Sequence, residues 1–133
     1  MASPTILIAD DNAEMREKIT TLLESHFQLV GTVTDGQQAI EFAIRLNPDV
    51  VLLDISMPLL NGIQVASRLR NMSCAAKLIF VTVHRDSDYI EAANLVGAVG
   101  YVVKEHIGDD LIPAIYAALE GRRFTSKLQP QHI

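Results

Sequence analysis

Residues 50–62 read VVLLDISMPLLNG, a stretch whose pattern indicates the class of fold. Four apolar residues, Val50 to Leu53, run without a polar interruption into Asp54. A continuous apolar run of this length is typical of a strand in a parallel sheet whose two faces are both covered. Comparable apolar, β-rich runs recur along the chain at Ile6–Ala9, Phe27–Val33, Leu78–Val83 and Ala98–Val103. The sequence therefore predicts five buried parallel strands.

The segments between these runs show the period of amphipathic helices. Apolar residues recur there three or four positions apart, which places them on one face of each helix. The five groups are Met15, Ile19, Leu22, Leu23 and His26; Ala39, Ile40, Ala43 and Ile44; Val65, Ala66 and Leu69; Tyr89, Ala92, Ala93 and Val96; and Leu111, Ile112, Ile115, Ala118 and Leu119. Alternating strands and helices predict an α/β fold, a doubly wound five-stranded parallel sheet in a three-layer α/β/α arrangement. Its ligand site is expected beyond the carboxyl ends of the strands.

Three aspartates and a proline mark the expected helix boundaries. Asp35, Asp86 and Asp110 are predicted N-caps, because a carboxylate at that position accepts a hydrogen bond from an otherwise unpaired amide. Pro113 would then lie in the first turn of the last helix. A residue without an amide hydrogen is tolerated there, since the first amides have no partner within the helix.

Composition limits the classes of function. The 133 residues, 49% of them hydrophobic, are enough for one compact domain and too few for two ordinary ones. The net charge of −5 disfavours binding of nucleic acid or of an anionic membrane by this segment. A single cysteine, Cys74, excludes an internal disulfide framework and suits a reducing compartment. No stretch approaches the roughly 20 apolar residues of a membrane span, so we expect a soluble, cytoplasmic protein without a membrane partner.

Polar residues with complementary chemistry stand at the carboxyl ends of four predicted strands. Asp10 and Asp11 follow the first strand, and Asp54 follows the third. Thr82 lies near the end of the fourth strand, and Lys104 follows the fifth. Three converging carboxylates repel one another unless a cation compensates them, and their hard oxygen atoms suit Mg²⁺. Beside a metal ion, Asp54 can act as a nucleophile toward phosphorus, with Thr82 and Lys104 contacting the phosphoryl oxygens.

Four motifs, in this order, resemble the receiver domains of two-component response regulators, also called CheY-like domains. The motifs are ILIADDN, VVLLDISMPLLNG, IFVTV and GYVVK, and the resemblance covers residues 5–121. It implies a (βα)5, flavodoxin-like fold and a phosphoacceptor role for Asp54. It also implies that Asp11 binds Mg²⁺ directly, that Asp10 binds it largely through water, and that the backbone carbonyl of Ser56 completes the metal shell.

Two further pairs of residues are expected to govern switching and signal lifetime. The resemblance implies that Tyr101 turns inward on activation, together with a movement of Thr82 and its loop toward the phosphoryl group. Ser56 and His84 are expected to border the path of the attacking water, the small serine leaving it open and the imidazole blocking it. Both residues should therefore modulate the rate of dephosphorylation without being required for phosphorylation.

The stretch DDLIPAIYAALEGRRFTSKL, residues 109–128, resembles the last receiver helix and linker of NarL/LuxR-type transcription regulators. We therefore expect a receiver domain at residues 1–121 and a linker or tail at residues 122–133, with a helix-turn-helix output domain absent from this chain. The expected partners are a sensor histidine kinase and, after phosphorylation, a second copy of the chain. DNA would be bound only through the separate output domain. The alternative is a stand-alone receiver that acts as a protein-binding adaptor.

Two other classes of protein fit the residues less well. An aspartyl-phosphate phosphatase needs a second carboxylate two residues after its nucleophile, and Ser56 stands there. A nucleotide- or flavin-binding module needs a glycine-rich phosphate loop, and neither GxGxxG after the first strand nor GxxxxGK[ST] occurs. We therefore expect a phosphoacceptor switch that catalyses its own phosphorylation and dephosphorylation, not an enzyme that acts on a separate substrate.

Overall fold

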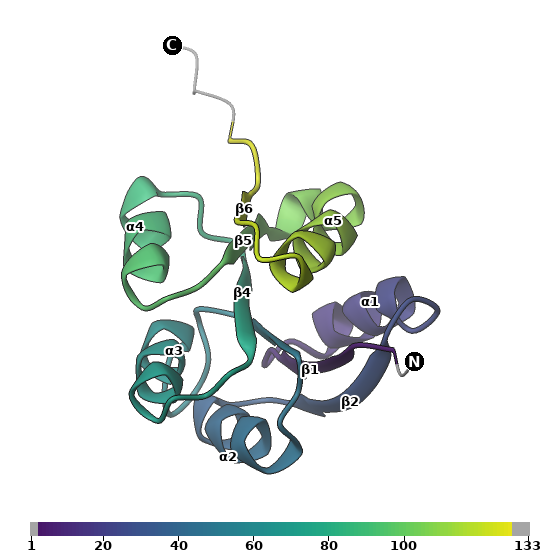
Figure 1. The fold of residues 1–133 in the computed structure, drawn as a ribbon. Coiled ribbons are helices and arrows are strands. Elements are labelled where there is room, and N and C mark those ends of the chain that lie inside the picture. The colour runs from purple at the N-terminus through teal and green to yellow at the C-terminus, as the bar shows by residue number, and fades with distance from the viewer. Residues whose placement is uncertain (1–2, 129–133) are drawn as a thin grey trace.

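The computed structural model describes residues 3–128 (Figure 1). Within that range a single parallel sheet has the strand order β2-β1-β3-β4-β5-β6. Its strands are Thr5–Ala9 (β1), Gln28–Val33 (β2), Val50–Leu53 (β3), Lys77–Thr82 (β4), Gly100–Val103 (β5) and Phe124–Thr125 (β6). The strand order reverses between β1 and β3, and in doubly wound sheets this switch point opens a crevice at the carboxyl ends of the strands.

Helices cover both faces of this sheet. They are Ala13–Leu23 (α1), Gly36–Leu46 (α2), Gly62–Asn71 (α3), Ser87–Leu95 (α4) and Ile107–Leu119 (α5), the last preceded by a 3₁₀ turn, Lys104–His106 (η1). Figure 1 shows α1 and α5 on one face and α2, α3 and α4 on the other. The predicted α/β fold with three layers is confirmed. Between residues 3 and 128 no helix combines the length and the apolar character that a membrane crossing requires.

Successive residues of the central strands contribute to two separate cores. In β3, Val51 and Leu53 pack in the core under α2, α3 and α4, whereas Val50 and Leu52 pack in the core under α1 and α5. All four side chains are buried, because side chains alternate between the faces and both faces carry helices. The unbroken apolar run before Asp54 is therefore the sequence signature of burial on both sides.

The sheet has one strand more than predicted. Phe124 and Thr125 lie in the segment expected to be a linker or tail, and they pair in parallel with Gly100 and Tyr101 of β5. A strand of two residues is held by its backbone hydrogen bonds and carries no apolar run. Hydrophobic periodicity therefore could not reveal it, and the prediction of five strands is corrected to six.

Two of the three predicted N-caps stand where they were expected. The side chain of Asp35 accepts a hydrogen bond from the amide of Gln38 at 2.8 Å and caps α2. Asp86 occupies the N-cap position of α4 but makes no capping hydrogen bond with its side chain. The start of α4 is therefore held less firmly by its cap than the start of α2.

The prediction for the last helix is wrong. Helix α5 begins at Ile107 because η1 runs directly into it, so Asp110 lies inside the helix and is not its N-cap. Pro113 consequently lies in the helix interior, not in its first turn. Its missing amide hydrogen removes one backbone hydrogen bond of α5.

Candidate functional site

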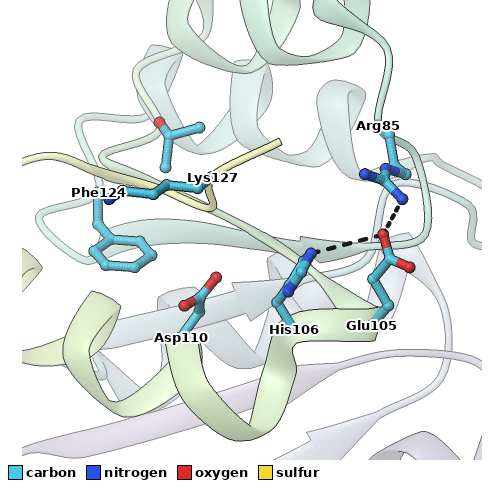
Figure 2. A pocket seen from close by; sticks show the side chains of 7 residues that line it. Arg85, Glu105, His106, Asp110, Phe124 and Lys127 are labelled. Atoms are coloured by element: carbon cyan, nitrogen blue, oxygen red, sulfur yellow. Dashed lines mark ion pairs between the residues drawn. The ribbon is translucent and has the colours of Figure 1, made fainter. Parts of the chain in front are cut away.

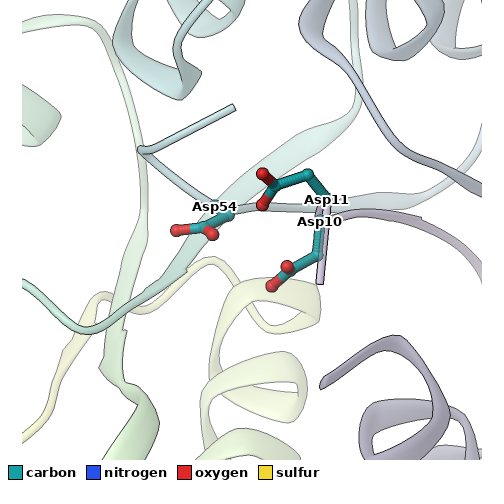
Figure 3. A group of neighbouring side chains, drawn as sticks. All are labelled: Asp10, Asp11 and Asp54. Carbon is teal, nitrogen blue, oxygen red and sulfur yellow. The ribbon is translucent and has the colours of Figure 1, made fainter. Parts of the chain in front are cut away.

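Three carboxylates meet at the carboxyl ends of β1 and β3 (Figure 3). Ala9 pairs with Leu53 across the two strands, so the residues that follow them, Asp10 and Asp54, are neighbours. Oxygen atoms of Asp10, Asp11 and Asp54 all lie within 4.8 Å of one another. Asp10 is 1% exposed and Asp54 5% exposed, whereas Asp11 is exposed to solvent. The structure thus brings together the three predicted acidic residues, two of them buried.

Lys104 joins this cluster from the end of β5. Its Nζ atom lies 2.8 Å from Oδ2 of Asp10 and 3.0 Å from Oδ2 of Asp54. The contact with Asp54 has the geometry of a hydrogen bond. The contact with Asp10 is an ion pair at hydrogen-bonding distance whose angles fall outside those of a hydrogen bond, so Oδ2 of Asp10 lacks a well-aligned partner among residues 3–128. One ammonium group therefore faces two buried carboxylates.

The pKa values of Asp54 and Lys104 are both raised, for different reasons. Burial raises the pKa of Asp54 above its usual value, and the charge and hydrogen bond of Lys104 offset this rise only in part. Burial on its own would lower the pKa of Lys104, but the contacts with Asp10 and Asp54 outweigh burial and raise it. The ammonium form of Lys104 is thus favoured, while the charged form of Asp54 lacks full compensation.

The set of donor atoms fits a hard divalent cation. Oδ2 of Asp10 is buried without a hydrogen-bond partner in the described part of the chain, and the cluster carries more negative charge than Lys104 neutralises. The loop after β3 stays close to Asp54, since the amide of Ser56 donates a long hydrogen bond of 3.4 Å to its Oδ1 atom. Mg²⁺ prefers such oxygen ligands and completes its shell with water and phosphate oxygens. The residues present therefore suit Mg²⁺.

Thr82 and Tyr101 hold the loop that follows β4. Thr82, the buried last residue of β4, accepts a hydrogen bond of 3.3 Å from the amide of His84 at its Oγ1 atom. Tyr101 of β5 is also buried, and its hydroxyl donates to the backbone carbonyl of His84 at 2.8 Å. Burial raises the pKa of Tyr101 well above its usual value, so the hydroxyl keeps its proton. The aromatic ring of Tyr101 thus points inward in this structure.

Ser56 and His84 contact each other at the edge of the site. Oγ of Ser56 lies 2.9 Å from Nε2 of His84, within hydrogen-bonding distance. The imidazole also stacks on Tyr89 of α4, with ring centroids 4.2 Å apart. Sequence reasoning placed both residues beside the reaction path but did not find their contact. The two positions are 28 residues apart, and no local pattern in the chain reports a pairing of that separation.

Gly62 has a packing role that motif matching alone did not reveal. Its amide donates to the carbonyl of Ile55 at 2.7 Å, and a Cβ atom on Gly62 would lie 2.2 Å from the backbone oxygen of Asp54. Only glycine lets the start of α3 approach Asp54 so closely.

The preceding residue, Asn61, caps α3 in a reciprocal capping box with Gln64. The spacing of asparagine and glutamine three residues apart was the signal that could have identified this cap.

Comparison with known sequences gives a family. Residues 6–116 match the family model for the response regulator receiver domain. The transcriptional regulatory protein DegU of Brevibacillus brevis is 35% identical over 118 residues, covering 87% of this chain and 50% of DegU. The nitrate/nitrite response regulator protein NarL of Escherichia coli K12 is 32% identical over 125 residues, covering 92% of this chain and 58% of NarL. The chain spans about half to three fifths of the length of such curated relatives.

Solved structures agree with this result. A two-component response regulator of the LuxR family from Aurantimonas sp. SI85-9A1 has a TM-score of 0.87 and 30% identity, covering 92% of this chain and 89% of that chain. The signal receiver domain of the putative response regulator NarL from Mycobacterium tuberculosis has a TM-score of 0.87 and 27% identity, covering 92% of this chain and 100% of that chain. This chain belongs to the family of response regulator receiver domains of two-component systems, and it is close to the NarL/LuxR type.

Proposed function

We propose that Asp54 is the phosphoacceptor of this receiver domain. The observation that carries the proposal is the buried carboxylate of Asp54 at the end of β3, beside two further carboxylates and 3.0 Å from the ammonium of Lys104. The donor is a phosphohistidine of a sensor kinase or a small molecule such as acetyl phosphate. An oxygen of Asp54 forms a bond to phosphorus while the bond between phosphorus and the donor breaks.

Asp10, Asp11, Asp54 and the backbone carbonyl of Ser56 would hold Mg²⁺ in this site. When bound, the ion supplies positive charge that offsets the charge of the phosphoryl oxygens and favours the ionised form of Asp54. That charge matters because burial raises the pKa of the nucleophile. Lys104 pairs with two carboxylates before the reaction, and we propose that it contacts a phosphoryl oxygen afterwards.

The proposed switch links Asp54 to the loop after β4. Among residues 3–128 the hydroxyl of Thr82 makes one hydrogen bond, a long one of 3.3 Å from the amide of His84, so it can turn toward a phosphoryl oxygen with little loss. That movement would draw the loop and α4 toward the site and favour the inward ring of Tyr101. Phosphorylation would thus bias two states that differ at the surface formed by α4 and β5.

Labelling of Asp54→Asn with acetyl phosphate and Mg²⁺ tests the phosphoacceptor. Wild type should gain one phosphoryl group per chain, stable to acid and labile to base, and Asp54→Asn should gain none. Asp88→Asn is the matched control, since Asp88 is an exposed aspartate of α4 outside the acidic cluster, and it should be labelled like wild type. Undiminished labelling of Asp54→Asn contradicts the proposal.

We propose that residues 1–121 form the receiver, that residues 122–133 belong to a linker, and that the whole protein controls transcription in the cytoplasm through a helix-turn-helix domain. The support is that several relatives are named transcriptional regulatory proteins and are longer than this chain. A homodimer formed after phosphorylation would then bring two output domains together. A full-length reading frame that encodes no DNA-binding domain would favour an adaptor instead.

A further inference from the structure

The residues that follow α5 return along the outer edge of β5. We call residues 122–128 the strap. The amide of Phe124 donates to the carbonyl of Val99 at 3.0 Å, and the amide of Ser126 donates to the carbonyl of Tyr101 at 2.8 Å. The strap thereby pairs β5 on the side that β4 leaves open.

Ser126 fixes the strap through its side chain as well. The hydroxyl is buried at 3% exposure, donates to Oδ2 of Asp110 in α5 at 2.6 Å and accepts from the amide of Val103 at 3.1 Å. If the strap detached, the buried amide of Val103 would lose a partner that it needs, and the half-buried carboxylate of Asp110 would lose its hydrogen bond to the hydroxyl. One hydroxyl therefore joins α5, β5 and β6.

Tyr101 is held by the strap on one side and by the loop after β4 on the other. Its carbonyl accepts the hydrogen bond from Ser126, and its hydroxyl donates to the carbonyl of His84 at 2.8 Å. Leu128 of the strap packs against the same hydrophobic core as the ring of Tyr101. Because the ring of Tyr101 and Leu128 of the strap share this core, a Tyr101 ring that turned outward would have to compete with the docked strap for space.

The docked strap also shapes the surface at this edge of the sheet. A cleft of about 620 Å³ is lined in part by Phe124, Thr125 and Lys127 of the strap, and Figure 2 shows Phe124 and Lys127 along one side of it. On the other side lie Arg85, from the loop after β4, and Glu105, from η1, which form an ion pair. Release of the strap would remove one wall of the cleft.

We propose that docking of the strap and the inward orientation of Tyr101 are two parts of one conformational switch. Docking stabilises the inward ring, and the inward ring stabilises docking, because coupling between two sites is reciprocal. The coupling is a property of the chain without a phosphoryl group. Only its use in signalling rests on the proposed function, in which the state of Asp54 would reach the strap and the linker through Tyr101.

Ser126→Ala tests the coupling in the whole chain, with NMR of ring-labelled tyrosine and amide hydrogen exchange. Without the hydroxyl, the Phe124 amide should exchange about tenfold faster, and the ring resonances of Tyr101 should shift. The ring of Tyr116 in α5 packs against Phe27 and not against Tyr101, so its resonances should stay unchanged. Thr125→Val is the matched control, because it removes an exposed hydroxyl from the neighbouring residue of the strap, and it should alter neither signal.

Tyr101→Phe tests the coupling in the opposite direction. It removes the hydrogen bond to His84, so exchange of the Phe124 amide should again become several-fold faster. If Ser126→Ala does not fold, Asp110→Ala breaks the same contact from α5, with Asp109→Ala as its control. The proposal is wrong if the Phe124 amide exchanges faster while the ring resonances of Tyr101 do not shift. It is also wrong if the Phe124 amide exchanges at the wild-type rate in these variants. Neither measurement needs a phosphodonor, so the result is independent of the labelling of Asp54.

Discussion

The ammonium of Lys104 lies 3.0 Å from Oδ2 of Asp54, although the two residues are 50 positions apart in the chain. The same ammonium lies 2.8 Å from Oδ2 of Asp10. One cation thus links the ends of β1, β3 and β5. Two buried carboxylates depend on it for compensation of their charge.

Lys104→Met should lower the free energy of unfolding at pH 7 by about 3 kcal/mol, because it leaves buried carboxylates without their cation. Added Mg²⁺ should restore part of the loss by binding to the same carboxylates. Urea denaturation with and without Mg²⁺ measures both effects. Lys18→Met changes an exposed lysine of α1 and should stay within about 0.5 kcal/mol of wild type. Equal losses in the two variants would contradict a role of Lys104 in charge compensation.

Asp54→Asn should be more stable than wild type at pH 7 in the absence of Mg²⁺. Since burial raises the pKa of Asp54 in the folded state, the folded chain holds this proton more tightly than the unfolded chain. The free energy of unfolding of wild type therefore falls as pH rises from the usual carboxyl pKa to the raised one. Asp54→Asn has no carboxyl group at this position, so its free energy of unfolding does not fall for this reason. Urea midpoints between pH 4 and pH 7 should show the advantage of the variant growing with pH. An advantage that shrinks as pH rises would exclude a raised pKa.

Asp11→Ala should weaken Mg²⁺ binding with little effect on folding. Asp11 is the exposed member of the acidic cluster, so its loss removes a ligand and leaves the buried pair in place. We expect the dissociation constant for Mg²⁺ to rise at least about tenfold, measured by calorimetry. Glu14→Ala removes an exposed carboxylate from the first turn of α1 and should leave the constant near that of wild type. An unchanged constant for Asp11→Ala would exclude direct ligation.

Gly62→Ala should destabilise the fold by about 1–3 kcal/mol, because the new methyl group would overlap the backbone oxygen of Asp54. The displaced backbone should also slow phosphorylation. Gly108 of α5 is the contrasting case, since a Cβ atom there would meet nothing within 4 Å. Gly108→Ala should therefore stabilise the chain by about 0.5 kcal/mol. Thermal unfolding measures the midpoints of both variants. Equal midpoints for Gly62→Ala and Gly108→Ala would argue against close packing at Gly62.

His84→Ala should speed hydrolysis of the phosphorylated chain several-fold, on the order of 1 kcal/mol in barrier, because the imidazole no longer narrows the path of water. Ser56→Asn should slow it by a similar factor. Since Ser56 and His84 lie within hydrogen-bonding distance, their effects should not add in the double variant. Release of phosphate from purified phosphoprotein measures the rates. Identical decay in wild type and variants would show that neither side chain controls the water.

The layered α/β fold and the region of the site can both be predicted from the pattern of residues along the chain. An apolar run such as Val50–Leu53 carries information about burial on both faces, and the helical period carries information about the covered face of each helix. Parallel strands align their carboxyl ends, so the chain order alone brought Asp10, Asp54 and Lys104 to one edge of the sheet. Local patterns of apolar residues and the topology of parallel sheets are sufficient for these features.

Contacts between segments that are remote in the chain could not be predicted in this way and are seen only in the folded protein. Strand β6 is held by backbone hydrogen bonds to β5, which leave no mark in the pattern of side chains. The pairing of Ser126 with Asp110 and that of Ser56 with His84 depend on how loops and helix ends pack. Many residue pairs share the same chemistry, and packing selects which of them lie within hydrogen-bonding distance.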